Sequence, residues 1–196
     1  MFSFVSKCAV LITGLVLLSN NAFAQNKLES WYTYWGLGYA DVKYPDELDD
    51  LLQDLEDAPG VDHVSIGLDF LGFYWPLNEQ TILGVIINGT GDRYEVSGSS
   101  MQINSYTFAF SAMRFLNNTI GKGIFVRAEA GPARLVVDTD DFGTESSDWG
   151  FGGLIGGGFG FNVSPGTRIL LNVNYAVRKV EGDSYNTFGL SIGGLF

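Results

Sequence analysis

The chain has 196 residues and a formal net charge of −11 at neutral pH, with 22 acidic residues against 11 basic ones. This acidity argues against nucleic acid as a partner, because surfaces that bind nucleic acid are basic. Glycine accounts for 26 residues and aromatic residues for 14 %, but Cys8 is the only cysteine. The fold is therefore expected to gain its stability without a disulfide framework.

The N-terminal residues have the pattern of a secretory signal peptide. Lys7 precedes the apolar run of residues 8–18, and the small residues Ala22 and Ala24 form a cleavage site. The apolar run is too short for a membrane anchor, since spanning a bilayer takes about 20 residues. We predict cleavage after Ala24, so that residues 1–24 are removed. Residues 25–196 then form one domain, which contains no cysteine.

Eight segments of the mature chain alternate apolar with polar or glycine residues. In chain order they are residues 31–41, 63–75, 81–91, 102–115, 123–137, 149–163, 168–180 and 184–196. Alternation with period two is typical of strands, and tilted strands of about 9–11 residues cross a membrane. Together with the glycine and aromatic content, the pattern predicts an all-β fold, an eight-stranded antiparallel transmembrane β-barrel with an up-and-down meander. In the fifth strand, Pro132 predicts a bulge near Gly131, because proline cannot donate to the ladder.

Charged residues on the polar strand faces indicate what fills the barrel. In a membrane barrel the apolar face contacts lipid and the polar face lines the lumen. Because buried charges must be paired, we predict a lumen charge network of Asp69, Arg127, Glu129, Arg168 and Arg178. Eight strands leave an interior just wide enough for side chains to fill it. A general porin is therefore not expected, whereas a narrow channel stays an alternative.

The connections between the segments predict an orientation. Short turns are expected at residues 76–80, 116–123 and 164–167, and longer connections at 42–62, 92–101 and 138–148, with a short one near Gly182. Barrels of this kind keep short turns in the periplasm and longer loops outside. Both chain ends would then be periplasmic.

The first outer connection is strongly acidic and has helical periodicity. Pro45 would begin the helix and Pro59 would stop it, while Leu48, Leu51, Leu52 and Leu55 share one face. Seven acidic residues lie between Asp46 and Asp57. Three interpretations stay open: a solvated helix that covers the barrel mouth, a docking surface for a partner, or a cation site. The spacing does not match a calcium loop of the EF-hand type. Residues 138–148 form a second acidic stretch, interpreted as solvated.

The only histidine raises the question of catalysis. His63 and Ser65 are two residues apart, so they share a strand face, and Asp69 lies on the same face. A nucleophile needs an adjacent base, which makes His63 and Ser65 weak candidates for a catalytic pair. A lumen-facing site could not be reached by lipid, so we interpret both residues as polar rim residues. The sequence predicts no metal site and no cofactor.

The signal peptide, the eight alternating segments and the terminal "FGLSIGGLF" resemble the small outer-membrane β-barrel proteins of Gram-negative bacteria, of the OmpX and opacity-protein type. This resemblance implies an outer-membrane location among lipids and lipopolysaccharide. It also implies delivery by periplasmic chaperones to the barrel assembly machinery, which would read a terminal signal of Phe188, Leu190, Ile192 and Phe196.

The expected function is non-catalytic: envelope integrity, adhesion or defence, with the acidic loops available to a host or cell-surface ligand. A lipid A-modifying barrel enzyme and a narrow-channel protein are the alternatives.

Overall fold

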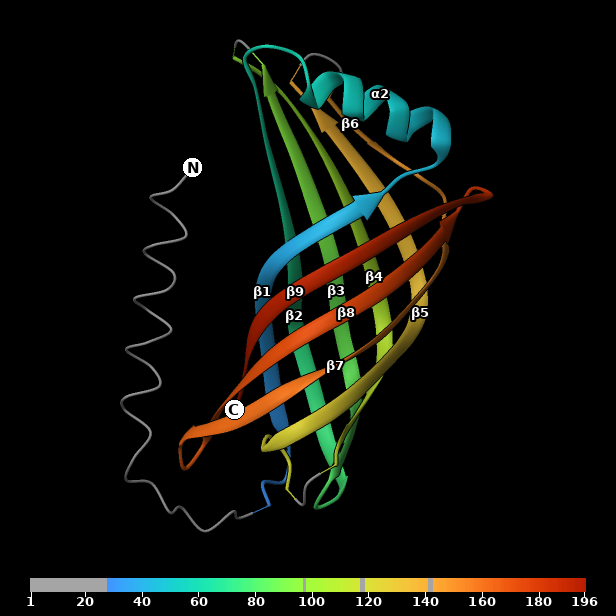
Figure 1. Ribbon diagram of the computed structural model, residues 1–196. Helices are drawn as coiled ribbons and strands as arrows, with labels where there is room; N and C mark the ends of the chain where they lie inside the picture. Colours follow the sequence, from blue (N-terminus) through green and yellow to red (C-terminus); the bar gives the residue numbers. More distant parts are fainter. Residues whose placement is uncertain (1–27, 97, 117–118, 141–142) are drawn as a thin grey trace.

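The computed structural model describes residues 28–96, 98–116, 119–140 and 143–196, so the predicted signal peptide lies outside the described residues. The elements are β1 (Tyr32–Lys43), α2 (Asp46–Glu56), β2 (Val61–Asn78), β3 (Thr81–Val96), β4 (Ser99–Phe115), β5 (Gly123–Thr139), β6 (Gly143–Ser146), β7 (Gly150–Ser164), β8 (Thr167–Val180) and β9 (Asp183–Leu195). All eight predicted strands are present (Figure 1).

Eight of these strands close into an antiparallel barrel, which confirms the predicted fold class. Strands adjacent in sequence pair with each other, β5 pairs with β7, and β1 pairs with β9 to complete the ring. Phe196 takes part in this closure, because its backbone exchanges two hydrogen bonds of 3.0 Å with that of Thr33. The short β6 pairs only with the end of β5. Closure removes the exposed strand edges that an open sheet would present.

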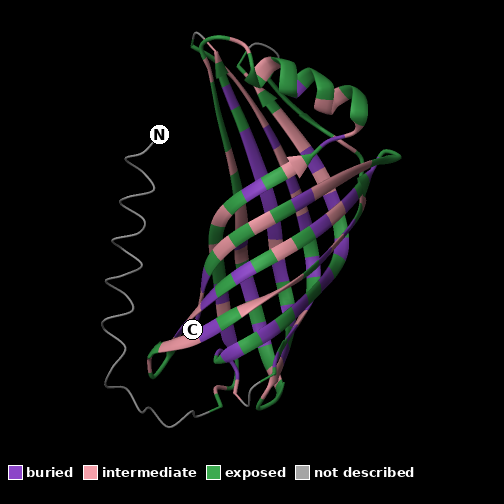
Figure 2. Ribbon diagram, viewed as in Figure 1, coloured by how far each residue is buried: buried purple, intermediate pink, exposed green. Residues whose placement is uncertain are grey.

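The strands alternate between an outward and an inward face, as Figure 2 shows by its alternating bands of buried and exposed residues. Large apolar side chains point outward along every barrel strand and are exposed by 40 % or more: they include Leu37, Phe73, Val85, Phe110, Val126, Ile155, Leu171 and Ile192. Removing such an apolar surface from water is favourable, so this outer belt is suited to contact with the hydrocarbon of a membrane.

The end of the barrel that is lowermost in Figure 1 is apolar inside, as its buried side chains show. It is filled by a cluster of side chains that each expose 3 % or less: Tyr32, Tyr34, Tyr74, Ile82, Ile86, Ala109, Met113, Phe115, Ile120, Phe125, Leu170 and Leu195. The expectation of a polar face along the whole lumen is therefore wrong at this end. A narrow barrel can pack its interior like a protein core. The packing also explains why Leu195 interrupts the alternation of the terminal strand.

Two local predictions about the strands are wrong. Residues 92–101 do not form a long connection, because β3 and β4 stay paired up to Val96 and Ser99. The pairs of β5 with β4 and β7 show no register shift at Pro132. A shift occurs instead in β2, between Phe70 and Phe73, where Leu71 has a φ of +52°. The paired ends of β3 and β4 were missed because strands that leave the membrane need no apolar outer face.

Helix α2 lies over the mouth of the barrel at its upper end (Figure 1). Leu52 is buried against Tyr44, Tyr94 and Ile103, and other apolar side chains surround this cluster: Val42, Leu48, Leu55, Val61, Met101, Val137 and Tyr185. The predicted leucine face therefore covers the mouth. Leu51 is an exception, being 65 % exposed, because it lies to one side of the stripe formed by its neighbours. Within the described ranges, no helix has the length and apolarity needed to span a membrane.

Candidate functional site

A network of charged side chains crosses the middle of the lumen. Arg127 on β5 donates two hydrogen bonds of 2.7 Å to the carboxylate of Asp69 on β2. Its Nε donates a third, of 2.6 Å, to Oε1 of Glu129. All three residues expose 6 % or less. A bidentate arginine–carboxylate pair is among the strongest and most directional side-chain contacts, so this group links opposite walls of the barrel.

Arg178 on β8 joins this network through an amide rather than by a direct ion pair. Its Nη2 donates to Oδ1 of Asn88 at 2.8 Å, and Asn88 in turn donates from Nδ2 to Oε2 of Glu129. The other donors of Arg178 reach the hydroxyls of Thr107 and Thr187. The network therefore connects β2, β3, β4, β5, β8 and β9, and its two guanidinium groups match its two carboxylates in formal charge.

Arg168, which we placed in the same network, lies elsewhere. Its guanidinium carbon is 5.0 Å from the ring centroid of Tyr32, in the apolar lower end. Its Nε and Nη1 form no hydrogen bond with the described residues. The register explains the correction: Arg168 pairs across the ladder with Leu195, whereas Arg178 is ten residues farther along the same strand. Sharing a lumen face does not bring two residues to the same depth.

A second cluster of polar side chains lies at the upper end, under α2. The imidazole Nδ1 of His63 on β2 is 2.9 Å from Oε1 of Glu56, at the end of the helix. Its Nε2 is 3.6 Å from Oδ1 of Asp92 on β3. The imidazole stacks on the ring of Tyr94, with centroids 4.4 Å apart, and the hydroxyl of Tyr94 donates to Glu56. His63 thus attaches the helix to the barrel wall.

Ser65 faces the same space but does not pair with the histidine. Its Oγ is buried and makes no hydrogen bond with any described residue. Both nitrogens of His63 face carboxylates instead. A nucleophile and its base must lie within hydrogen-bond reach of each other. The geometry therefore lacks the contact that a catalytic pair of His63 and Ser65 would need.

A cavity of about 350 Å³ separates α2 from the upper strands. His63, Ser65 and Asp92 line it, together with Tyr44, whose hydroxyl donates a 2.5 Å hydrogen bond to Oδ2 of Asp92. Burial and the neighbouring Asp92 carboxylate raise the pKa of Tyr44 above its ordinary value, so the phenol keeps its proton and stays a donor. Within the described ranges, no group of three or more His, Cys, Asp or Glu side chains is arranged to hold a metal ion.

Sequence reasoning found His63 and Ser65 but missed the residues that face them. Nothing in the sequence distinguishes Glu56 from the other acidic residues of the helix, and Asp92 falls in the predicted connection of residues 92–101. Asp92 becomes the direct cross-strand neighbour of Ser65 only because β2 and β3 pair above the membrane-facing belt. Counting from the turn at residues 79–80 would pair Ser65 with Tyr94, but two register shifts in β2 move the pairing to Asp92.

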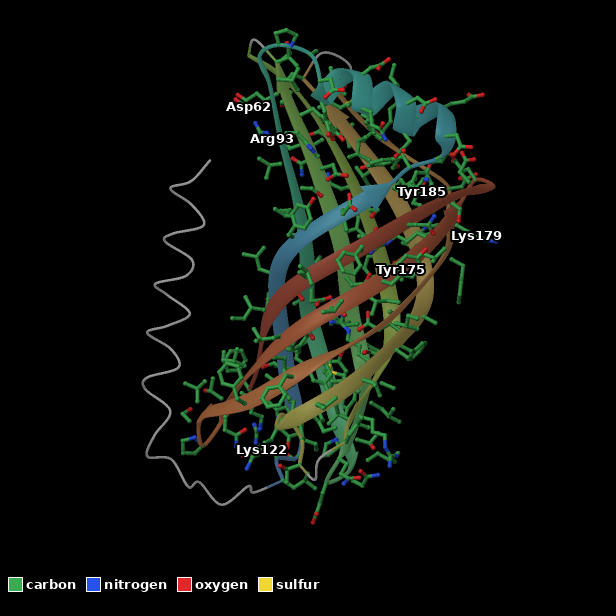
Figure 3. The ribbon with its side chains drawn as sticks, in the orientation of Figure 1. Asp62, Arg93, Lys122, Tyr175, Lys179 and Tyr185 are labelled. Carbon is green, nitrogen blue, oxygen red and sulfur yellow. The ribbon has the colours of Figure 1, made fainter. Side chains whose placement is uncertain are left out.

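The terminal strand places its predicted assembly residues on the outer face. Phe188, Leu190, Ile192 and Phe196 are each between 45 % and 48 % exposed, on the side of the apolar belt. Charged side chains mark the two ends of the barrel, with Lys122 at the lower end and Asp62 and Arg93 at the upper end (Figure 3). The four predicted assembly residues thus form an exposed apolar row from the middle of β9 to the last residue of the chain.

In sequence, no protein-family model and no curated protein matches the chain. In structure, it is similar to Neisserial surface protein A, with a TM-score of 0.56 and 14 % identity over 86 % of this chain and 97 % of that chain. It is also similar to Ail, the attachment invasion locus protein of Yersinia pestis, solved in complex with the heparin analogue sucrose octasulfate. There the TM-score is 0.50 and the identity 17 %, over 86 % of this chain and 100 % of that chain. These likenesses concern the fold, and they confirm the resemblance to small eight-stranded outer-membrane barrels.

Proposed function

We propose that the protein is a non-catalytic outer-membrane barrel whose lumen is structural and whose extracellular end, led by α2, makes surface interactions. The observation that carries this proposal is the division of the molecule into a filled lumen and an acidic, solvent-facing helix. The end that holds α2 is extracellular, and the end with the tight turns and both mature termini is periplasmic, as in barrels of this kind.

The filled lumen supports a structural role for the barrel interior. Arg127, Asp69 and Glu129 cross it in the middle, and the aromatic and aliphatic cluster fills it below. A transport path would have to pass both layers. Breaking a buried ion pair leaves an uncompensated charge, so such a layer resists opening.

The surroundings of His63 favour a non-catalytic role over lipid A modification. Its two nitrogens face Glu56 and Asp92, and Ser65 is not hydrogen-bonded to it. The site also faces the inside of the barrel, whereas lipid contacts the outer face. An enzyme acting on lipid A would need its nucleophile within reach of the lipid.

The chemistry of α2 indicates the kind of partner. Asp46, Glu47, Asp50 and Asp54 are exposed on the helix, and its last turn carries no basic residue. Opposite charges steer association, so the expected partner is a basic protein surface rather than a sulfated polyanion such as the heparin analogue bound by Ail. In this respect the chain would differ from that structural neighbour. Attachment of this kind would serve adhesion or defence.

The route to the membrane is part of the proposal. After cleavage following Ala24, periplasmic chaperones would deliver the chain to the barrel assembly machinery, which would read Phe188, Leu190, Ile192 and Phe196. The outer belt would then contact phospholipid and lipopolysaccharide.

Cells that display the protein provide a test of the surface role. Polylysine-coated beads should bind cells with the wild-type chain more strongly than cells with a variant in which Asp46, Glu47, Asp50 and Asp54 are changed to their amides. A variant with Asp138, Asp140, Glu145 and Asp148 changed to amides removes equal charge from the other acidic loop and is the control. Equal binding by wild type and helix variant would contradict the assignment of the surface to α2. A change of lipid A mass on expression of the wild-type chain would contradict the non-catalytic assignment.

A further inference from the structure

The cavity under α2 contains two buried oxygen atoms whose hydrogen-bonding capacity is unused. Oδ1 of Asp92 and Oγ of Ser65 accept no hydrogen bond from the described residues, although Nε2 of His63 lies 3.6 Å from that Asp92 oxygen, and both residues line the cavity. Asp92 is only 2 % exposed. A buried acceptor without a donor is unfavourable, which makes each such atom in a native structure a position where a partner is expected.

The two oxygens lie close enough to act on one ligand group. Ser65 and Asp92 are directly opposite each other in the β2–β3 ladder. Cross-strand neighbours on one face have Cβ atoms about 4.5–5.5 Å apart, a distance that a single donor group can bridge. The other oxygen of Asp92 is held by the Tyr44 hydroxyl, which fixes the orientation of the carboxylate. The unused oxygen is thus presented by a preorganised side chain.

The rest of the lining favours a cation that also has an apolar part. Asp41, Asp49 and Glu56 add acidic groups, against Lys43 and His63, and the buried tyrosines Tyr44 and Tyr94 form part of the wall. Carboxylates combined with aromatic rings are the usual surroundings of organic ammonium groups. Asp49 already accepts hydrogen bonds from the Tyr44 backbone and from Gln53. Asp92 is therefore the carboxylate with an oxygen to spare.

The position of the cavity selects a soluble ligand. Ser65 and Asp92 point to the inside of the barrel, while Val64 between His63 and Ser65 is 57 % exposed on the outer face. Above Gly38 and Gly67, where their pairing ends, β1 and β2 separate, and the cavity lies beside this gap, between residues 39–44 and His63 and Ser65. Asp41 and Lys43 are exposed residues of the lining, so the cavity is open to the solution at the mouth.

We propose that this cavity binds a small soluble organic cation with a primary ammonium group. The ammonium group donates hydrogen bonds to Oδ1 of Asp92 and to Oγ of Ser65. The alkyl part of the ligand lies against the tyrosine rings. The site is independent of the interaction surface proposed for α2, because none of the four carboxylates of that surface lines the cavity.

Titration of the isotope-labelled barrel in lipid nanodiscs tests this site by NMR, at constant ionic strength. The probe is butylammonium chloride, and 1-butanol is its uncharged counterpart of similar size. We expect saturable shifts of the Ser65 and Asp92 amide signals with butylammonium and no saturation with butanol. Asp92→Asn should weaken binding about ten-fold or more, because a hydrogen bond to a charged group is lost. Asp54→Asn removes the same charge outside the cavity and should change affinity by less than about two-fold.

Several results would overturn the proposal. Absence of saturable shifts would mean that the cavity holds only water. Equal weakening of binding by Asp92→Asn and Asp54→Asn would mean that butylammonium responds only to the overall negative charge of the mouth. Tighter binding of magnesium chloride than of butylammonium would identify a site for inorganic cations. Should Asp92→Asn fail to fold, Ser65→Ala provides the second variant, with a weakening of about three-fold or more expected and none if the proposal is wrong.

Discussion

The two polar clusters of the molecule use the same kinds of residue in opposite ways. In the middle of the lumen, every charged group of Arg127, Asp69 and Glu129 meets a partner, and the side chains are almost completely buried. At the mouth, His63 and Glu56 keep solvent contact, with side-chain exposures of 28 % and 39 %, and Oδ1 of Asp92 accepts no hydrogen bond, with Nε2 of His63 3.6 Å away. The middle network is thus satisfied by its own side chains, whereas the mouth cluster contains the unsatisfied oxygen on which the proposed ligand site depends.

The largest effect is expected from breaking the middle cluster. Arg127→Ala leaves Asp69 and Glu129 buried without their donor, and the loss should be about 3–5 kcal/mol of unfolding free energy. The control is Arg93→Ala in the upper part, whose ion pair with Glu95 is more than half exposed and should contribute at most about 1 kcal/mol. Urea unfolding in lipid vesicles measures both. Similar losses for the two variants would remove the distinction between the clusters.

A slightly smaller effect is expected from the apolar layer below the cluster. Leu195 is fully buried, so Leu195→Ala should cost about 2–5 kcal/mol through lost contacts and a cavity. Phe196, one residue farther, is 48 % exposed, and Phe196→Ala should cost less than about 1.5 kcal/mol in the refolded protein. In cells, Phe196→Ala should lower the amount of protein assembled in the outer membrane more than Leu195→Ala does, because the terminal phenylalanine belongs to the predicted assembly signal. Cell fractionation checks this, and unchanged outer-membrane levels of the Phe196 variant would contradict the signal.

At the mouth, the anchoring of α2 should be weaker and local. Leu52→Ala removes the buried leucine of the helix and should destabilise its docking by about 2 kcal/mol. Leu51→Ala is the matched control, because Leu51 is exposed. Limited proteolysis of residues 44–60 reports the difference while the barrel stays folded. Equal protection in both variants would mean that the leucine face does not hold the helix.

The smallest effect is expected for the coupling free energy between two charged residues that lie two positions apart on one strand. Arg127 donates a 2.6 Å hydrogen bond to Glu129. A double-mutant cycle with alanine should give a coupling free energy of about 0.5–3 kcal/mol for this pair. The same cycle for Arg93 and Glu95, also two residues apart, should give a value near zero because both are exposed. Additive losses at Arg127 and Glu129 would show that each relies on other partners.

The eight strands could be predicted from the sequence because the membrane imposes a regular alternation on them. The inward position of the aromatic residues at the lower end could not be predicted, because alternation distinguishes the two faces of a strand but does not indicate what each face contacts. Leu195 is an example: it interrupts the pattern of outward apolar residues because it packs into the interior. Above the apolar belt the constraint disappears, and the paired ends at Val96 and Ser99 resembled a loop.

The candidate site was predictable only in part, for a related reason. The face of a residue follows from the period of the strand, so His63, Ser65 and Asp69 were placed together on the lumen side. The depth of a side chain in the lumen depends on the register between strands. This register places Arg168 far from Arg127 and Asp92 opposite Ser65. No local pattern carries that information.

Conductance in a planar lipid bilayer tests the central claim, a lumen closed by its own side chains, most directly. The wild-type barrel should give no steady channel steps, because the network around Arg127 and the apolar layer below it fill the interior. Replacing residues 46–56 by a short glycine–serine linker should leave it silent, since the helix covers the mouth but does not close the middle. Steady conductance of the wild type, or its appearance on removal of the helix alone, would contradict the account.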